Sequence, residues 1–190
     1  MIETAGPAAS VALFDGEVLI AAQREETARG TAERLMTMID MLHPSEVGEI
    51  LVDVGPGSFT GLRVGLAAAI GLGIGWDVPV NGFSATALVA ARALSEGAAG
   101  PLLAVNEGGH GQYFVQRFSD APLSAEGAVA SLRVDEILIH SRTAVGNAAH
   151  KFGGMTTELD ARFALYLPTE LRCLPPVPIY GRAPDAKPRT

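Results

Sequence analysis

The residues that could perform chemistry in this chain are few and lie far apart. Cys173 is the only cysteine, it lies among Leu and Pro, and no histidine is near it in the sequence. Ser58 is followed by Phe59 and Thr60, so it does not form the Gly-x-Ser-x-Gly elbow of a serine hydrolase. No two histidines have the i, i+4 spacing that places two metal ligands on one helix face; the four are His43, His110, His140 and His150. The sequence therefore predicts no metal, no cofactor and no catalytic residue.

The glycine-rich segment 55–61 is the other candidate for chemistry, because glycine-rich turns before helices can bind phosphate. Its residues are Gly55, Pro56, Gly57, Ser58, Phe59, Thr60 and Gly61, with Arg63 one turn further on. The segment lacks the Gly-Lys-Ser/Thr ending of a P-loop, and its glycine spacing differs from that of a dinucleotide-binding fingerprint. These features favour a structural turn over a phosphate site.

This turn connects a short strand to a long apolar helix. Residues 50–54 form an apolar run typical of a buried strand, and Ser58 or Thr60 can cap a helix that continues to Trp76. Each glycine inside a helix is unfavourable by about 1 kcal/mol, so a compensating contact is expected. Small residues recur every four positions on one face, which would let another backbone approach closely; they are Gly57, Gly61, Gly65, Ala69 and Gly73. A membrane span is disfavoured because Arg63 interrupts the run.

A second helix is predicted over residues 31–42. Leu35, Met38, Ile39 and Leu42 follow the helical repeat, and Met36 and Met41 widen the apolar face. One core contact needs only about 100° of arc, so the width suggests an additional apolar contact. Methionine suits adaptable interfaces, which favours a partner protein, although burial in the chain's own core explains the pattern nearly as well.

The remaining chain reads as two α/β halves followed by a tail. A hairpin is expected around Asp15-Gly16, a short extended piece at 78–80, a turn at Asn81-Gly82 and a helix capped by Ser84. The flexible segment 95–101 marks a lobe boundary. Strands are expected at 102–105 and 113–118, on either side of a glycine-rich loop. The pattern of residues 134–139 fits either a helix or a strand. The pattern of residues 144–149 fits a turn between a strand and a helix. The proline-rich end should be extended.

Composition restricts the function further. The 190 residues are 48% hydrophobic and only 18% charged, with 14 basic and 21 acidic residues and a net charge of −7. This balance argues against broad binding to nucleic-acid phosphate backbones, because such binding needs clustered Lys and Arg. The start of the chain shows no signal sequence, so a cytoplasmic protein is expected.

The segment from Gly55 to Gly65 resembles the signature of the bacterial TsaB (YeaZ) family. Its sequence is Gly-Pro-Gly-Ser-Phe-Thr-Gly-Leu-Arg-Val-Gly. Pro178-Ile179-Tyr180-Gly181-Arg182 is similar to the family's closing motif. The resemblance implies an α/β, actin-like and sugar-kinase-like (ASKHA, ribonuclease H-like) fold of two lobes, with mixed sheets flanked by helices. It implies lobes at 1–97 and 98–174, and an extended tail at 175–190.

The same resemblance implies a non-catalytic subunit of the tRNA threonylcarbamoyladenosine pathway. Its partner would be a TsaD-like transferase, with a TsaE-like ATPase in the complex, and the subunit could form a homodimer when alone. In that family two N-terminal helices of each subunit pack together. The corresponding interface residues here would be Leu35, Met36, Met38, Ile39, Met41, Leu42, Gly61, Gly65 and Ala69.

Three departures from the family pattern leave alternatives open. The first strand is short, and Glu3 replaces an Asp that handles nucleotide phosphates and metal in active relatives with this fold. We expect Glu3 to be an exposed residue near the terminus. In the second lobe Glu107 replaces an Asp and Gly109 an Arg. The alternatives are an ATP-dependent actin-like phosphotransferase and a decayed family member without a partner.

Overall fold

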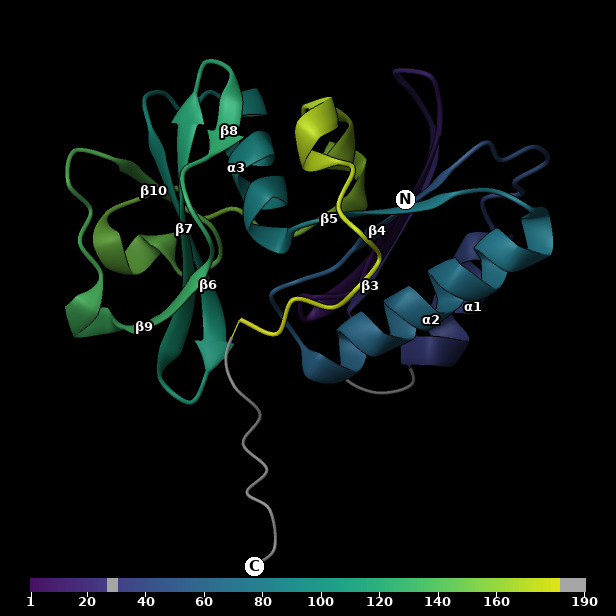
Figure 1. Cartoon of the computed structure of the whole chain (residues 1–190), viewed down its shortest axis with the longest axis horizontal. Helices are drawn as coiled ribbons and strands as arrows, with labels where there is room; N and C mark the ends of the chain where they lie inside the picture. The colour runs from purple at the N-terminus through teal and green to yellow at the C-terminus, as the bar shows by residue number, and fades with distance from the viewer. Residues whose placement is uncertain (27–30, 182–190) are drawn as a thin grey trace, which may run out of the picture.

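The computed structural model describes residues 1–26 and 31–181 and contains two five-stranded sheets (Figure 1). In the first sheet the strand order is β3-β2-β1-β4-β5. Strands β1 and β2 are antiparallel, as are β2 and β3, whereas β1, β4 and β5 run parallel. The strands are β1 (Ile2–Glu3), β2 (Ala8–Asp15), β3 (Val18–Glu26), β4 (Ile50–Asp53) and β5 (Val80–Phe83).

The second sheet has the order β10-β6-β7-β8, and β9 also pairs with β7. Strand β10 runs parallel to β6, and the other pairs are antiparallel. Its strands are β6 (Leu102–Gly109), β7 (Gln112–Asp120), β8 (Leu123–Ala125), β9 (Ala130–Arg133) and β10 (Thr143–Val145).

The helices are arranged in layers with the sheets. They are α1 (Thr31–Asp40), α2 (Phe59–Trp76) and α3 (Ala85–Ser95), with 3-10 helices η1 (Val134–Glu136), η2 (Ala149–Phe152), η3 (Ala161–Tyr166) and η4 (Thr169–Leu171). Helices α1 and α2 cover one face of the first sheet, and α3 and η3 lie between the two sheets (Figure 1). This arrangement confirms the predicted two-lobe fold of mixed sheets flanked by helices.

Two large cores follow from these layers. One joins α1 and α2 to the first sheet and contains Leu35, Met38 and Val52. The other joins both sheets through α3 and contains Phe83, Leu88 and Phe118. The two lobes therefore share buried apolar surface instead of being connected only by a linker.

The segment after η4 returns to the first lobe. Leu174 and Gly82 exchange backbone hydrogen bonds of 3.0 and 2.7 Å, and the Ile179 N–H donates to the Val54 carbonyl at 2.6 Å. Figure 1 shows this yellow segment crossing the first sheet. Residues 182–190, including Arg182 of the closing motif, lie outside the described residues.

Several local predictions are corrected by the structure. Asn81 and Gly82 lie inside β5 and not in a turn, because a Cβ on Gly82 would approach Val54 Cγ1 to 2.6 Å. Strand β6 continues to Gly109 where a loop was expected. Residues 134–139 fitted either helix or strand, and Val134–Glu136 form a 3-10 helix.

Helix α2 is the one helix in the described parts of the chain that is long and apolar enough to cross a membrane. Length and composition alone do not separate such a span from a core helix. One side of α2 is buried against the first sheet through residues that include Leu62, Leu66 and Ala69. That packing matches a helix of a folded lobe.

Candidate functional site: the glycine-rich turn and the surface beside it

The turn between β4 and α2 is packed against two other segments of the chain. A Cβ on Gly55, which has φ +103°, would lie 2.6 Å from the Ile179 carbonyl oxygen. A Cβ on Gly57 would lie 2.5 Å from the Ala5 carbonyl oxygen. The Ser58 N–H donates to that same Ala5 oxygen at 2.8 Å. These contacts occupy the space around the turn, and they explain why glycine is needed at both positions.

Ser58 begins α2 as its N-cap. Its hydroxyl oxygen accepts a hydrogen bond from the Gly61 N–H at 3.2 Å, so Ser58 and not Thr60 is the capping residue. The Ser58 side chain therefore has a structural partner. It shows no histidine contact that would activate it as a nucleophile.

An exposed cluster of two aromatic rings and one cation lies next to the turn. The Arg63 guanidinium carbon is 3.8 Å from the centre of the Phe59 ring, and that ring is 5.2 Å from the ring of Tyr180. Arg63 Nε donates to the Tyr180 hydroxyl at 3.1 Å. The cluster joins the glycine-rich motif to the closing motif, and Phe59 remains 54% exposed.

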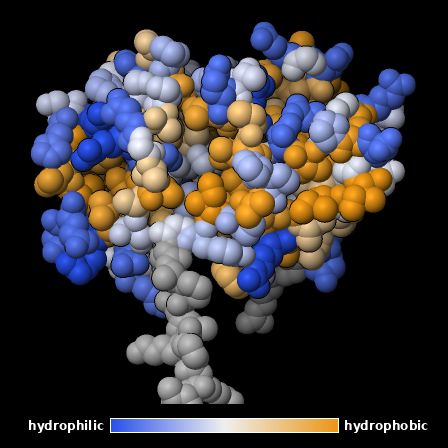
Figure 2. All heavy atoms as spheres, in the orientation of Figure 1, coloured by the Kyte–Doolittle hydropathy of each residue, from blue (hydrophilic) through white to orange (hydrophobic). Residues whose placement is uncertain are grey.

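A shallow groove of about 510 Å³ runs from this cluster between α1 and α2. It is mostly apolar, with Arg63 and Thr60 among the few polar side chains. Its other lining residues are Ala32, Met36, Phe59, Val64, Ala67 and Ala68. Further along α2, Ile70, Ile74 and Trp76 are also exposed. Figure 2 shows hydrophobic residues gathered over α2. Continuous apolar surface of this kind is typical of an interaction site.

The predicted interface residues divide into two groups. Met36 and Met41 are 47% and 52% exposed and could contact a partner. The others are buried inside the chain itself, and Met38 is only 1% exposed; they are Leu35, Met38, Ile39, Leu42, Gly61, Gly65 and Ala69. The interface itself stays a prediction, and among these residues Met36 and Met41 are the ones with exposed side chains.

The small-residue stripe of α2 faces the chain's own first sheet. A Cβ on Gly61 would lie 2.0 Å from the Thr4 carbonyl oxygen, and one on Gly65 would lie 2.2 Å from Thr4 Oγ1. The Thr4 hydroxyl donates to the Gly61 carbonyl at 2.8 Å. The close approach inferred from the stripe thus occurs within one lobe, between α2 and the segment that follows β1.

Glu3 and Asp53 form a buried acidic pair beneath the turn. The expectation of an exposed Glu3 is wrong, since its side chain has no solvent exposure. Glu3 Oε1 accepts from the Ala5 and Gly6 N–H groups at 2.8 and 3.1 Å, and Oε2 accepts from Ser10 Oγ at 2.9 Å. The Glu3 carboxylate is therefore buried next to β1, and these three donors supply its hydrogen bonds.

Burial controls the ionisation of this pair. It raises the pKa of Glu3 to about 7, while the hydrogen bonds from Gly6, Ser10 and Ala5 act in the opposite direction. Burial, followed by the negative charge of Glu3, raises the pKa of Asp53 well above its usual value. Asp53 Oδ1 accepts from the Gly55 N–H at 2.6 Å, whereas Oδ2 has no partner. Two carboxyls alone do not make a metal centre, and no cluster of three potential ligands occurs among the described residues.

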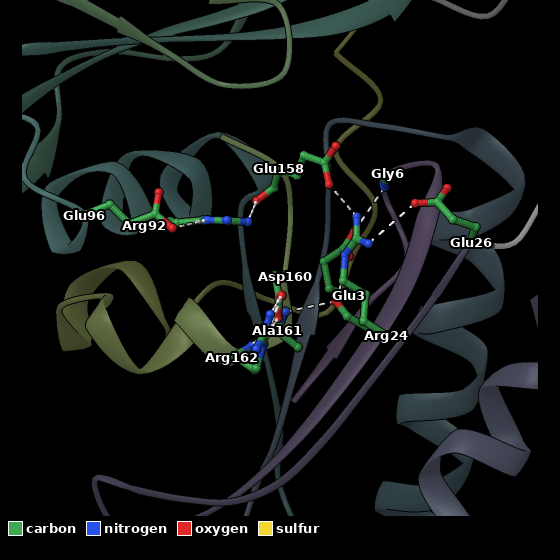
Figure 3. Close-up of polar contacts among 11 residues, drawn as sticks. Glu3, Gly6, Arg24, Glu26, Arg92, Glu96, Glu158, Asp160, Ala161 and Arg162 are labelled. Carbon is green, nitrogen blue, oxygen red and sulfur yellow. Dashed lines mark hydrogen bonds and ion pairs between the residues drawn. The ribbon is translucent and has the colours of Figure 1, made fainter. Parts of the chain in front are cut away.

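Contacts of Glu158 connect the two lobes. Arg24 Nη2 and Glu158 Oε2 are 2.6 Å apart, and Arg92 Nη1 donates to the Glu158 carbonyl at 2.9 Å (Figure 3). The cavity beside this contact measures about 30 Å³ and is lined by residues that include Gly6, Asn106 and Asn147. Such a space holds roughly one to two waters. Glu107 is exposed and pairs with Lys151 at 3.2 Å.

Sequence reasoning missed Arg24, Glu158 and the partnership of Arg63 with Tyr180. The contacts join residues that are 134 and 117 positions apart, so no local pattern could reveal them. Asp53 did have a signal, because it is an acidic residue inside the apolar run Ile50–Val54. A charge in a buried strand usually has a specific partner.

Comparison with solved structures identifies the class of protein. A crystal structure described as an uncharacterised Pseudomonas aeruginosa protein with similarity to the peptidase YeaZ superposes with a TM-score of 0.80 and 23% identity. It covers 95% of this chain and 97% of that one. A second structure, YeaZ from Pseudomonas aeruginosa, gives 0.79 and 21%, covering 94% and 97%. The chain therefore has the actin-like fold of YeaZ.

Sequence comparison gives the family. Residues 20–152 match the family described as TsaD, tRNA N6-adenosine threonylcarbamoyltransferase. The Escherichia coli tRNA threonylcarbamoyladenosine biosynthesis protein TsaB is 33% identical over 153 residues, which are 74% of this chain and 64% of that protein. An uncharacterised Mycobacterium leprae protein is 29% identical over 98% of this chain and 55% of its own length. The chain belongs to this family and is similar to its TsaB (YeaZ) members, and it spans less than two thirds of both relatives.

Proposed function

We propose that this chain is a non-catalytic scaffold subunit in the formation of N6-threonylcarbamoyladenosine in tRNA, beside the anticodon. It binds and supports a TsaD-like transferase in the cytoplasm, in a complex that also contains a TsaE-like ATPase. The proposal is supported by the similarity to Escherichia coli TsaB and by the exposed apolar groove between α1 and α2. Without the transferase, the same surface would form a homodimer.

The groove has the physical properties that a protein partner requires. Its centre is apolar, with Met36 and Val64 on opposite helices, and Arg63 supplies a charge at its edge. Aromatic, methionine and arginine side chains are enriched in interface centres. The stacking of Arg63 on Phe59 holds both side chains in place before binding, which lowers the entropy lost on association.

Direct recognition of tRNA is not part of this function. The net charge of −7 opposes binding to a phosphate backbone. We propose that tRNA contacts come from the partner subunits.

The test compares two methionines of α1 that differ in exposure. Met36→Asp places a charge in the groove, and we expect it to weaken association at least tenfold with little change in Tm. Met38→Asp places the charge in the core, so we expect it to unfold the protein, because a buried charge without a partner is severely destabilising. Circular dichroism melting and size-exclusion chromatography, with and without a TsaD-like protein, measure both effects.

The control is Leu138→Asp, a charge at a residue that is 58% exposed in the other lobe. It should change neither melting nor association. If Met36→Asp remains folded and still associates like the unmodified protein, the groove is not the partner surface.

A further inference from the structure

One cation lies at the edge of the apolar groove between α1 and α2. Arg63 is exposed and is the charged member of the residues that line the groove, whose other polar side chain is Thr60. The net charge of the chain is −7, so this positive charge does not belong to a generally basic surface. A single cation at the edge of an apolar surface gives an interface a preferred orientation as well as affinity.

Two aromatic rings hold the Arg63 guanidinium. Its central carbon lies 3.8 Å from the centre of the Phe59 ring and 5.8 Å from that of the Tyr180 ring. Its Nε donates to the Tyr180 hydroxyl at 3.1 Å. A guanidinium stacked on a ring still directs its N–H donors outward in its own plane. The donors on Nη1 and Nη2 are therefore the ones that remain for another group.

Arg63 has no acidic partner within residues 1–26 and 31–181. In contrast, Arg24, Arg92 and Arg142 each form an ion pair with a glutamate of the chain. The two terminal nitrogens of a guanidinium match the two oxygens of a carboxylate, with which they form parallel hydrogen bonds. Arg63 thus presents a carboxylate-binding fork that the described residues do not occupy.

The closing segment of the described chain fixes the position of Tyr180. On one side of it, the Ile179 N–H donates to the Val54 carbonyl of the first lobe at 2.6 Å. On the other side, Gly181 lies against the Phe114 ring of the second lobe with no room for a Cβ. The backbone of Tyr180 is therefore anchored on both sides, so its hydroxyl holds the guanidinium at a defined place beside α2.

We propose that Arg63 binds a carboxylate of the partner protein, supplied by an Asp or Glu that projects from an apolar surface. The inference rests on the proposed function, because it states what the partner presents to the same groove. Apolar side chains of the partner would cover Met36 and Val64, and the carboxylate would accept from Nη1 and Nη2 in the plane of the guanidinium. Phe59 and Tyr180 are positioning residues, since they hold the guanidinium and leave those donors exposed. The ion pair fixes the orientation in which the two proteins associate.

The test measures the Kd of the intact protein for a TsaD-like transferase by isothermal titration calorimetry. Arg63→Gln should weaken association by roughly tenfold without a change in Tm, because the carboxylate of the transferase then loses its charged partner. Arg117→Gln is the matched control. It removes an equal charge from an exposed position of β7, in the other lobe, and should leave the Kd unchanged.

A double-mutant comparison identifies the carboxylate. Each exposed Asp and Glu of the transferase is replaced in turn by the corresponding amide. One replacement should weaken association with the unmodified protein by roughly fivefold or more and have no effect on Arg63→Gln, because the two residues form one contact. Tyr180→Phe removes the hydroxyl and keeps the ring. It should weaken association of the unmodified protein but not of the Arg63→Gln variant, which a purely structural role would not produce.

The outcomes separate this proposal from the proposed function. If Arg63→Gln keeps the unmodified Kd while Met36→Asp loses binding, the carboxylate contact is wrong and the groove remains the partner surface. The contact is also wrong if no amide replacement is coupled to Arg63→Gln. If the unmodified protein does not bind the transferase, both proposals fall. Weaker self-association of Arg63→Gln in analytical ultracentrifugation, with unchanged transferase binding, would assign the carboxylate to a second copy of this chain and overturn the proposal.

Discussion

Glu3 shows how the surroundings of a single residue can change its role. Glu3 stands where active relatives with this fold have an Asp that handles metal and phosphate. From the sequence, Glu3 could have been either an exposed residue or a phosphate-binding group. Its oxygens instead accept three hydrogen bonds from Ala5, Gly6 and Ser10. The Ser10 hydroxyl also accepts from the Ala161 N–H at 2.9 Å, which connects Glu3 to the segment between the lobes. Glu3 is thus part of the structural core.

The raised pKa of Glu3 predicts a pH dependence of stability. Its pKa rises from 4.5 to about 7 on folding, so the proton-bound form stabilises the native state. That contribution is complete below pH 4.5 and is lost as the pH rises through 7. Glu3→Gln removes this titration and should decrease the loss of unfolding free energy between pH 5 and 8 by at most roughly 3 kcal/mol.

Urea unfolding at pH 5 and pH 8 measures the effect. The Met1 amine titrates in the opposite direction in this range and is present in both proteins. Glu3→Gln also removes the negative charge that raises the pKa of Asp53, so the measured change includes Asp53 and has the same sign. Glu17→Gln, at the exposed hairpin turn, is the control. Identical pH profiles for Glu3→Gln and the unmodified protein would contradict the assignment.

Helix α2 has glycines with two different roles. Gly61 and Gly65 lie against Thr4 with no room for a Cβ, whereas nothing lies within 4 Å of a Cβ on Gly71 or Gly75. The first pair sets the distance between α2 and the first sheet. The second pair lies on the outer side, where glycine only lowers helix stability.

Matched alanine substitutions should therefore have opposite signs. Gly61→Ala forces the helix away from Thr4 and should lower the unfolding free energy by roughly 1–3 kcal/mol. Gly71→Ala should raise it by about 1 kcal/mol, since alanine favours the helix. Thermal melting gives both values, at roughly 2–4 °C for each kcal/mol in a chain of this size. A neutral Gly61→Ala would show that α2 can shift freely on the sheet.

At the scale of the whole molecule, polar contacts and a shared core hold the two lobes together. Arg24 and Arg92 both bond Glu158, and the shared core around α3 holds the sheets together. The cavity beside Glu158, of about 30 Å³, is too small for a nucleotide. The absence of a phosphotransferase activity stays a prediction.

We expect the isolated protein to release no phosphate from ATP and magnesium above a blank. The reasons are the small volume of the cavity beside Glu158 and the burial of Glu3, the residue at the position of the family's Asp. A phosphate-release assay over several hours measures this. Phosphate release that disappears in Glu3→Gln would restore the phosphotransferase alternative.

Much of the local structure could be predicted from the sequence. The Ser58 and Ser84 caps, the Asp15-Gly16 hairpin and the apolar run before the turn have strong local signals, and the structure has the elements there. The Asn81-Gly82 dipeptide predicted a turn, but the same two residues also fit within a strand. The packing of Gly82 against Val54 and Leu174 decides between them.

The sequence by itself determined the family, the two-lobe fold class and the existence of two apolar helices near the glycine-rich turn. These conclusions depend on the hydrophobic periodicity and on the residues of one motif, which are local properties of the sequence. The tertiary structure decided which face of each helix is buried, because a helix with apolar residues around most of its circumference does not specify its orientation. It also decided that Glu3 is buried and that Arg63 meets Tyr180, since both depend on contacts between segments distant in sequence.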